Sequence, residues 1–178
     1  MEWLLLGVAI AVLALMGSLL SWRAGRLDRL QTRIETGRAV LDAQLFHRSG
    51  VALEVAAADV LDPATALVLL DAAHEARAAS PAERQSAESD LTRTLSAVFA
   101  DPEHVRELSA APPDAALLDE LAAACRKVEL ARRFHNDTVS SALALRSRRL
   151  VRWFGLAGRS DPPLMVEMDD APPAGLLR

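Results

Sequence analysis

The feature that most constrains this chain is an apolar run near its start, WLLLGVAIAVLALMGSLLSW, which extends from Trp3 to Trp22 without a charged side chain. Because a helix rises about 1.5 Å per residue, roughly 20 residues cover the ~30 Å hydrocarbon thickness of a bilayer. A tryptophan lies at each end, where amphipathic rings favour the membrane interface. The sequence therefore predicts a transmembrane anchor over residues 1–25.

The charges on either side of the run predict its orientation. Arginines follow it at Arg23, Arg26, Arg29 and Arg33, whereas only Glu2 and the terminal amine precede it. The positive-inside rule then puts the N-terminus outside and the C-terminal domain in the cytoplasm, in a single-pass inner-membrane protein. A cleaved signal peptide is the alternative, but it would need a basic N-terminal region and a cleavage site of small residues, and neither is present.

The composition of the remaining chain favours helices. Hydrophobic residues make up 51 % of the 178 residues but aromatic residues only 4 %, and the apolar content is mostly Ala, Leu and Val. Ala and Leu are strong helix formers, and the aromatic residues that strands prefer are scarce. The net charge of -4 argues against a nucleic-acid partner. The single cysteine, Cys125, excludes an intrachain disulfide.

Apolar periodicity and helix-start signals predict the helices after the anchor. Asp62-Pro63 and Asp101-Pro102 each combine an N-cap acceptor with a proline suited to the first helical turn. Ser80 and Glu83 have the spacing of a capping box. Helices are expected over 26–61, over 63–79, from 80 onward, for a turn or two from 102, and over 115 to about 154.

The last of these helices has the clearest apolar seam. Its members recur at three- and four-residue steps, as a helix that buries one face requires. They are Leu117, Leu121, Ala124, Val128, Ala131, His135, Thr138, Ala142 and Leu145. A single histidine on such a seam is more typical of a hydrogen-bonded core residue than of a ligand.

The predicted fold class is therefore all-α, with a single N-terminal transmembrane helix followed by an elongated antiparallel bundle of three to four long helices. The bundle is expected over residues 26–155, and residues 156–178 are expected to form a flexible tail because they are rich in proline and acidic residues. Two topologies stay open. The chain either reverses at Asp62 and Ser80, or the first two bundle helices form one arm kinked at Pro63, and the kinked arm is slightly favoured.

No complete catalytic or cofactor motif is present, so the sequence predicts a non-enzymatic protein without cofactors or metals. Two Asp-x-x-His pairs occur, Asp71/His74 and Asp101/His104, but a metal site in a helical bundle needs further carboxylates from other helices. The HEARA segment lacks the second histidine of the zinc-protease signature.

A basic, aromatic segment near the end of the last helix is the candidate lipid or partner patch. Arginines alternate there with large apolar side chains, a combination typical of helices that lie on anionic lipids. The patch residues are Arg146, Arg148, Arg149, Arg152, Trp153 and Phe154. A solvated basic helix end is the alternative interpretation.

Three segments carry a resemblance to a known family. RLDRLQTRIETGRAVLDAQLFHRSGVALEVA follows the apolar run, EARAAS spans Glu75–Ser80, and ARRFHNDTV spans Ala131–Val139. Together they resemble the LemA family of bacterial membrane proteins, from Leu27 to about Val139. The resemblance implies a short external N-terminus, one membrane span and a cytoplasmic helical bundle, and it implies no enzymatic activity.

The ARRFHNDTV stretch is interpreted as a structural signature. Consecutive helical residues diverge by about 100°, so residues that are dense in sequence are dispersed in space, which argues against an active site. Phe134, His135 and Val139 are expected to pack or hydrogen-bond across helices, and Arg132 and Asp137 to face neighbouring helices or a partner. The signature comprises Ala131, Arg132, Arg133, Phe134, His135, Asn136, Asp137 and Val139.

These observations lead to the hypothesis of a membrane-anchored cytoplasmic scaffold or adaptor that acts through contacts with an unidentified protein partner. The alternative is an anionic-lipid or envelope sensor that uses the basic patch over 146–159. Self-association also stays open, because small residues on one stripe of the apolar run would let two helices approach closely. These are Gly7, Ala11, Ala14, Ser18 and Ser21.

Overall fold

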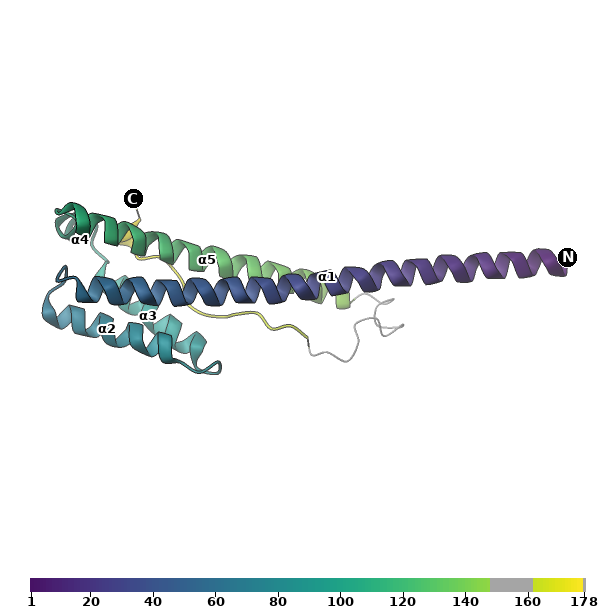
Figure 1. Ribbon diagram of the computed structural model, residues 1–178, viewed down its shortest axis with the longest axis horizontal. Coiled ribbons are helices and arrows are strands. Elements are labelled where there is room, and N and C mark those ends of the chain that lie inside the picture. Colours follow the sequence, from purple (N-terminus) through teal and green to yellow (C-terminus); the bar gives the residue numbers. More distant parts are fainter. Residues whose placement is uncertain (148–161, 178) are drawn as a thin grey trace. The chain divides into compact units, whose positions relative to one another are not determined.

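The computed structural model describes residues 1–147 and 162–177; in the first half of the first helix, several side chains between residues 4 and 28 lie outside the description. Every regular element among the described residues is helical, which confirms the all-α class (Figure 1). The elements are α1 (Glu2–Ala57), α2 (Pro63–Ala78), α3 (Arg84–Val98), α4 (Pro102–Leu108), α5 (Pro112–Arg146) and the 3-10 helix η1 (Ala174–Leu176).

The transmembrane part of the predicted fold is wrong. Among the residues that the structure describes, no helix has both the length and the apolar character needed to cross a membrane. The run Trp3–Trp22 does not form an element of its own, because it is the first part of α1, which continues as one helix to Ala57. The location and orientation inferred from the run stay predictions.

The chain divides into two compact units. The first unit consists of Met1–Thr36 and Asn136–Met165, and the second of Gly37–His135 and Val166–Arg178. Within the first unit, Val139, Ala142 and Leu145 are buried along the end of α5. The second unit holds the two hydrophobic cores, the buried ion pair and the contacts of the C-terminal segment described below.

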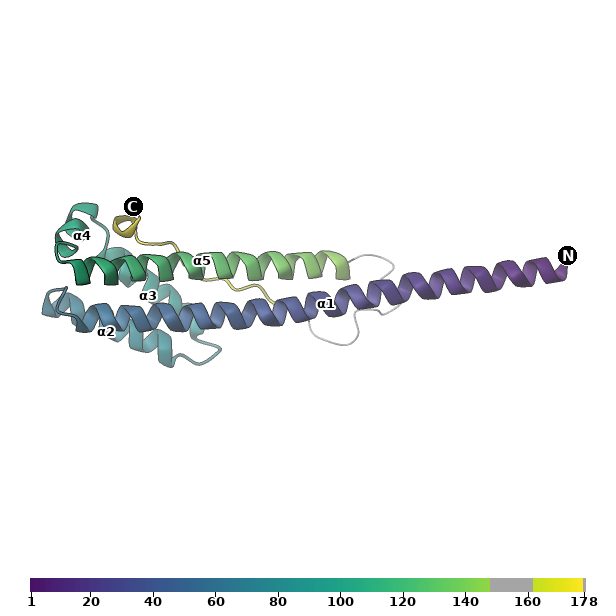
Figure 2. The ribbon, with the colours of Figure 1, turned by 45° about the horizontal axis from the view of Figure 1, so that its top comes forward.

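In the second unit the helices alternate in direction, so the kinked-arm topology is wrong. Both views show α2 turning back along the end of α1, and α3 turning back along α2 (Figures 1 and 2). The reversal after α1 is made by Asp59, whose φ of 54° lies in the left-handed region. Asp residues tolerate this conformation better than most. Pro63 then occupies the first turn of a new helix instead of the middle of a kinked one.

The two Asp-Pro start signals are confirmed. The Asp62 carboxylate accepts hydrogen bonds from the backbone N–H groups of Ala64 and Thr65, at 3.1 and 3.2 Å. These bonds hold the pKa of Asp62 below its usual value. The Asp101 carboxylate accepts from the backbone N–H of Glu103 at 2.8 Å. Each aspartate thus satisfies donors that the first helical turn leaves without partners.

Two predicted helix starts are shifted. The Ser80 hydroxyl donates to the Glu83 carboxylate at 2.6 Å, and α3 begins only at Arg84. The capping-box side chains therefore bond to each other instead of to backbone amides. At the other shifted start, α5 begins at Pro112, because a proline fits the first turn, where its missing N–H costs nothing. The predicted end of this helix near residue 154 lies outside the described residues.

Two hydrophobic cores stabilise the second unit. The main core joins α1, α2, α3, α4 and α5 through buried side chains that include Val55, Leu69, Leu95, Phe99 and Leu121. The second core consists of Leu41, Leu45, Val128, Ala131 and Val166. Each large apolar side chain buried in this way contributes about 1.5–3 kcal/mol. The buried members on α5 confirm most of its predicted apolar seam.

The prediction of a flexible tail is corrected for residues 166–177. Val166 belongs to the second core and Leu176 to the main core, so this segment packs against helices distant in sequence. Both views show its C-terminal end close to α4 (Figures 1 and 2). Its prolines suit an extended segment, because proline cannot continue a helix and donates no backbone hydrogen bond. We call residues Val166–Leu177 the tail.

Candidate functional site

The signature stretch on α5 divides between the interior and the surface. His135 is buried, as predicted, and lies close to Gly37 of α1, where a Cβ added to the glycine would be 3.6 Å from His135 Nδ1. Val139 is also fully buried. Phe134, in contrast, is 60 % exposed. The exposure of Phe134 follows from helical geometry, because consecutive residues point about 100° apart and the neighbouring His135 points into the interior.

Arg132 of the signature binds the tail. Its Nε and Nη2 atoms donate to the two carboxylate oxygens of Asp170, at 2.5 and 2.8 Å. This bidentate geometry is the strong form of an arginine–carboxylate pair. The hydrogen bond to Asp170 raises the pKa of Arg132. Asp170 is buried, so the pair fixes the middle of the tail to α5.

The other signature residues do not gather around Arg132. Arg133 pairs with Glu129 one turn earlier on the same helix, with Nη2 and Oε1 2.5 Å apart. Asn136 is half-buried and Asp137 is exposed. Ala131 is buried in the second core. The stretch is therefore dispersed around the helix, as the sequence argument expected.

The basic patch cannot be placed as a whole. Arg146 is the last residue of α5 and is half-buried. The other members, Arg148, Arg149, Arg152, Trp153 and Phe154, lie outside the described residues. The lipid-binding interpretation of this segment stays a prediction.

The two Asp-x-x-His pairs do not converge with other acidic groups. Asp71 and His74 are exposed on α2, and Asp101 is the cap of α4. His104 lies 4.0 Å from Glu107 on the exposed side of the same short helix. Within residues 1–147 and 162–177, no group of three or more His, Cys, Asp or Glu side chains is placed to hold a metal ion.

An exposed apolar surface lies along α1 and α5 in the second unit. The two helices are adjacent on this flank, since His47 Nε2 of α1 lies 3.9 Å from Glu120 Oε1 of α5. Val40 precedes His47 by seven residues and Phe134 follows Glu120 by fourteen, so both lie close to the same flank by helical periodicity. Leu130 lies one turn before Phe134. We call Val40, Leu130 and Phe134 the α1–α5 surface; they are 47 %, 64 % and 60 % exposed.

A buried ion pair that the sequence argument did not predict joins α1 to α3. Arg48 Nη2 donates to the Glu88 carboxylate at 2.6 Å, and Nη1 donates to the Thr92 hydroxyl at 2.9 Å. Both charged side chains are almost completely buried, at 1 % and 3 % exposure. Burial raises the pKa of Glu88, and the charge of Arg48 opposes that rise. Arg48 lies among apolar residues on the inner face of α1. Its place in that apolar pattern was the sequence signal from which its burial could have been predicted.

The tail lies in a groove with contributions from three helices and the loop that follows α3. Side chains of α3 accept from tail backbone amides: Gln85 Oε1 from Glu167 N–H at 3.1 Å, and Ser89 Oγ from Asp169 N–H at 3.0 Å. Further along, the Phe99 carbonyl accepts from Gly175 N–H at 2.9 Å. We call this surface, completed by Arg132 and by α4, the tail groove.

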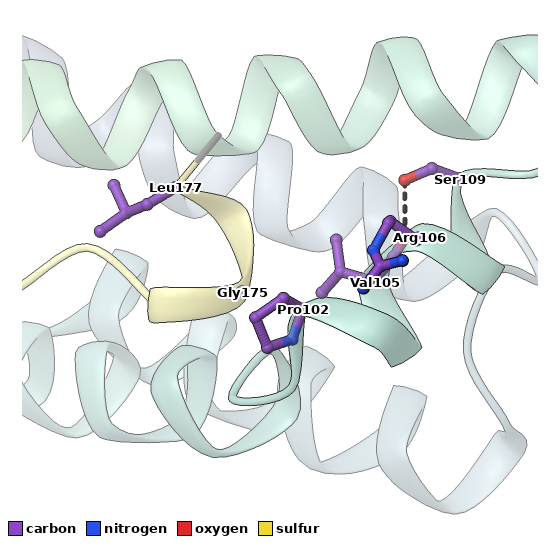
Figure 3. Close-up of a pocket in the computed structure, with 6 residues that line it drawn as sticks. All are labelled: Pro102, Val105, Arg106, Ser109, Gly175 and Leu177. Atoms are coloured by element: carbon purple, nitrogen blue, oxygen red, sulfur yellow. Dashed lines mark hydrogen bonds between the residues drawn. The ribbon is translucent and has the colours of Figure 1, made fainter.

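An open pocket lies at the α4 end of the tail groove. Its volume is about 490 Å³, and it is lined by Pro102, Val105, Arg106, Ser109, Gly175 and Leu177. Figure 3 shows the tail residues on one side of it and the α4 residues on the other. Ser109 is occupied locally, because its hydroxyl donates to the Val105 carbonyl at 2.7 Å. Arg106 bonds to Glu103 one turn earlier at 3.3 Å, and both side chains are exposed.

No family model, curated protein or solved structure matches the chain. The resemblance to the LemA family therefore stays a prediction.

Proposed function

We propose that the chain is a helical scaffold or adaptor that acts through protein–protein contacts, without catalysis. The observation that carries the proposal is the α1–α5 surface. Three large apolar side chains of two packed helices are exposed, although the adjacent interior positions of both helices are filled by core residues. Large apolar side chains that are exposed close together are typical of surfaces that bind another protein.

The electrostatics of the surface fit the same role. Lys127 lies one helical turn before Leu130, so a basic side chain borders the apolar residues. Interfaces commonly combine an apolar centre with a charged rim, and the rim contributes to association rate and specificity more than to affinity. A partner that presents an apolar helix face bordered by acidic residues would complement this surface.

The test compares two leucines of equal exposure on different helices. Leu130 is 64 % exposed on α5, and Leu67 is 65 % exposed on α2. Leu130→Glu and Leu67→Glu therefore cost similar apolar area and add the same charge, and neither disturbs a core. Each tagged variant would be isolated from cells at native expression, and the co-purifying proteins quantified by mass spectrometry.

We expect the wild-type chain and Leu67→Glu to retain one stoichiometric partner that Leu130→Glu loses. Unchanged circular dichroism and thermal unfolding of both variants would show that the folds are intact. Equal retention by Leu130→Glu would contradict a role for the α1–α5 surface, and a wild-type chain without any stoichiometric partner would contradict the adaptor function itself.

A further inference from the structure

One stripe of α5 is accessible to solvent along most of its length. Its members recur at alternating steps of four and three residues, which is the spacing that keeps side chains on one face of a helix and lets two helices pack along a seam. They are exposed or half-buried, and we call them the α5 stripe: Ala116, Glu120, Ala123, Lys127, Leu130 and Phe134. The stripe therefore includes both α5 members of the α1–α5 surface.

The α5 stripe carries one acidic and one basic side chain that their own helix does not pair. The residues three and four positions away from Glu120, and from Lys127, are all alanine or leucine on both sides. Ion pairs on a helix surface form at just these spacings. Glu120 has a neighbour on α1, His47 at 3.9 Å, which is charged only when it is protonated. Both charges can therefore be paired from outside the chain.

The spacing of the two charges makes the stripe complementary to itself. Glu120 and Lys127 are seven residues apart, about 10.5 Å along the helix. A two-fold axis level with Ala123 makes two α5 helices antiparallel and brings Glu120 of one copy opposite Lys127 of the other, twice. The small side chain of Ala123 near the axis lets the helices approach closely. A parallel pair would instead bring like charges together, which is unfavourable.

The apolar members of the stripe also find apolar neighbours in this antiparallel register. Counted from the same axis, Leu130 of one copy comes level with Leu117 of the second copy, and Phe134 comes level with Pro113 of the second copy. Pro113 is exposed and Leu117 is half-buried on its own chain. The two ion pairs thus lie near the centre of the contact, and the large apolar side chains lie towards its ends.

We propose that the α5 stripe is the contact surface of a homodimer, in which two α5 helices pack antiparallel and Glu120 of each copy pairs with Lys127 of the other. This inference rests on the proposed function and names the partner of the same surface as a second copy of the chain. The chain itself presents the apolar helix face with an acidic residue that the α1–α5 surface requires.

Reversal of the charges tests the pairing. Sedimentation velocity of the full-length chain at concentrations up to about 100 μM detects dissociation constants as weak as that value. We expect the wild type to reach twice the 19.2 kDa mass of one chain. Glu120→Lys and Lys127→Glu each create like charges at both contacts, so each should weaken self-association by about 30-fold or more.

Two rescues distinguish this pairing from any other effect of the substitutions. An equimolar mixture of the Glu120→Lys and Lys127→Glu proteins has opposite charges at both contacts, so it should form a heterodimer with close to wild-type affinity. The double variant Glu120→Lys/Lys127→Glu should recover the homodimer for the same reason. Glu75→Lys makes the same charge change at an exposed position on α2 and should leave the dimer intact. Circular dichroism of each variant checks that the helices are retained.

Three results would overturn the inference: a wild-type chain that is monomeric throughout this range, a dimer that neither single charge reversal weakens, or a mixture that stays monomeric. Failure of the dimer is distinguishable from failure of the adaptor function. If the purified chain is monomeric while Leu130→Glu loses another protein in cells, the inference fails and the adaptor function stands. If the charge reversals behave as expected while the chain isolated from cells carries no other protein, the homodimer stands and the adaptor function fails.

Discussion

The ion pair between Arg48 and Glu88 provides the sharpest test of how the second unit is held together. Both side chains are almost completely buried, and the guanidinium also donates to Thr92 and to the Glu88 carbonyl. Among the described atoms, however, the buried Nε of Arg48 has no hydrogen-bond acceptor. The pair therefore recovers only part of the free energy that burying two charges costs.

Substitution of one partner should be severe, and substitution of both should be mild. Arg48→Met leaves a buried carboxylate, and Glu88→Met leaves a buried guanidinium, so each is expected to lower the free energy of unfolding by about 3–5 kcal/mol. The double variant Arg48→Met/Glu88→Met removes both charges and fills the space with apolar groups. We expect it to be within about 1 kcal/mol of the wild type, or more stable.

Urea unfolding followed by circular dichroism would measure these differences. With an m-value of about 2 kcal/mol/M, a loss of 4 kcal/mol lowers the midpoint by about 2 M. A double variant as unstable as the sum of the two single variants would refute the reasoning, because it would show that the two side chains do not act as a pair.

The pH dependence of the two single variants should differ in a way that only a buried pair explains. In Arg48→Met, the folded-state pKa of Glu88 rises further, because the cation that opposed the effect of burial is gone. The folded state then binds a proton more readily than the unfolded state, so stability increases as the pH falls towards the unfolded pKa of about 4.3. Glu88→Met should show no such recovery, because the guanidinium cannot lose its proton.

Three other changes have direct expectations. Asp59→Gly should raise stability by about 0.5–1 kcal/mol in urea unfolding, because glycine adopts the positive φ of this turn without strain, whereas Ala58→Gly should not. The wild-type protein should lose stability as the pH falls through the lowered pKa of Asp62, because the carboxylate that caps α2 becomes protonated. Asp62→Asn should keep the helical content of α2 but lack this pH-dependent part of the stability, and thermal unfolding at several pH values would measure the difference. Burial raises the pKa of the Cys125 thiol, so a thiol reagent should label it only after denaturation; rapid labelling of the native protein would contradict its burial.

Local signals predicted the helices well because they act within a few residues. The caps at Asp62 and Asp101 depend on one side chain and the two amides that follow it, so the spacing alone was sufficient. The seam of α5 follows from a period that any buried helix must obey. The start of α3 was missed because Ser80 and Glu83 can bond to each other as easily as to backbone amides, and the spacing does not distinguish the two.

The direction of the chain between α1 and α2 depends on one backbone angle. Asp-Pro is compatible with a kink and with a new helix, and the positive φ at Asp59 decides between them. Aspartate reaches that region more often than most residues but does not require it. The sequence therefore left both topologies open.

The parts of the site that were missed rest on contacts between residues far apart in the chain. Arg132 was expected to face a neighbouring helix or a partner, but its partner is Asp170, in a segment that proline and acidic composition marked as flexible. Composition predicts disorder only when a segment has no surface to bind. The groove that holds this segment is assembled from separate helices, so no local pattern in the tail could reveal it.

The contacts of the tail explain why its composition alone was misleading. Val166 and Leu176 lie in different cores, with the Arg132–Asp170 pair between them, so the tail is held at a few separated places. Ordering the backbone of each residue between those places costs about 1–2 kcal/mol, and the burial of Pro173 and Gly175 and the hydrogen bonds to Gln85, Ser89 and Phe99 offset part of that cost. Because Val166 and Leu176 belong to the two cores, the tail contributes to the packing of the helices as well as depending on it.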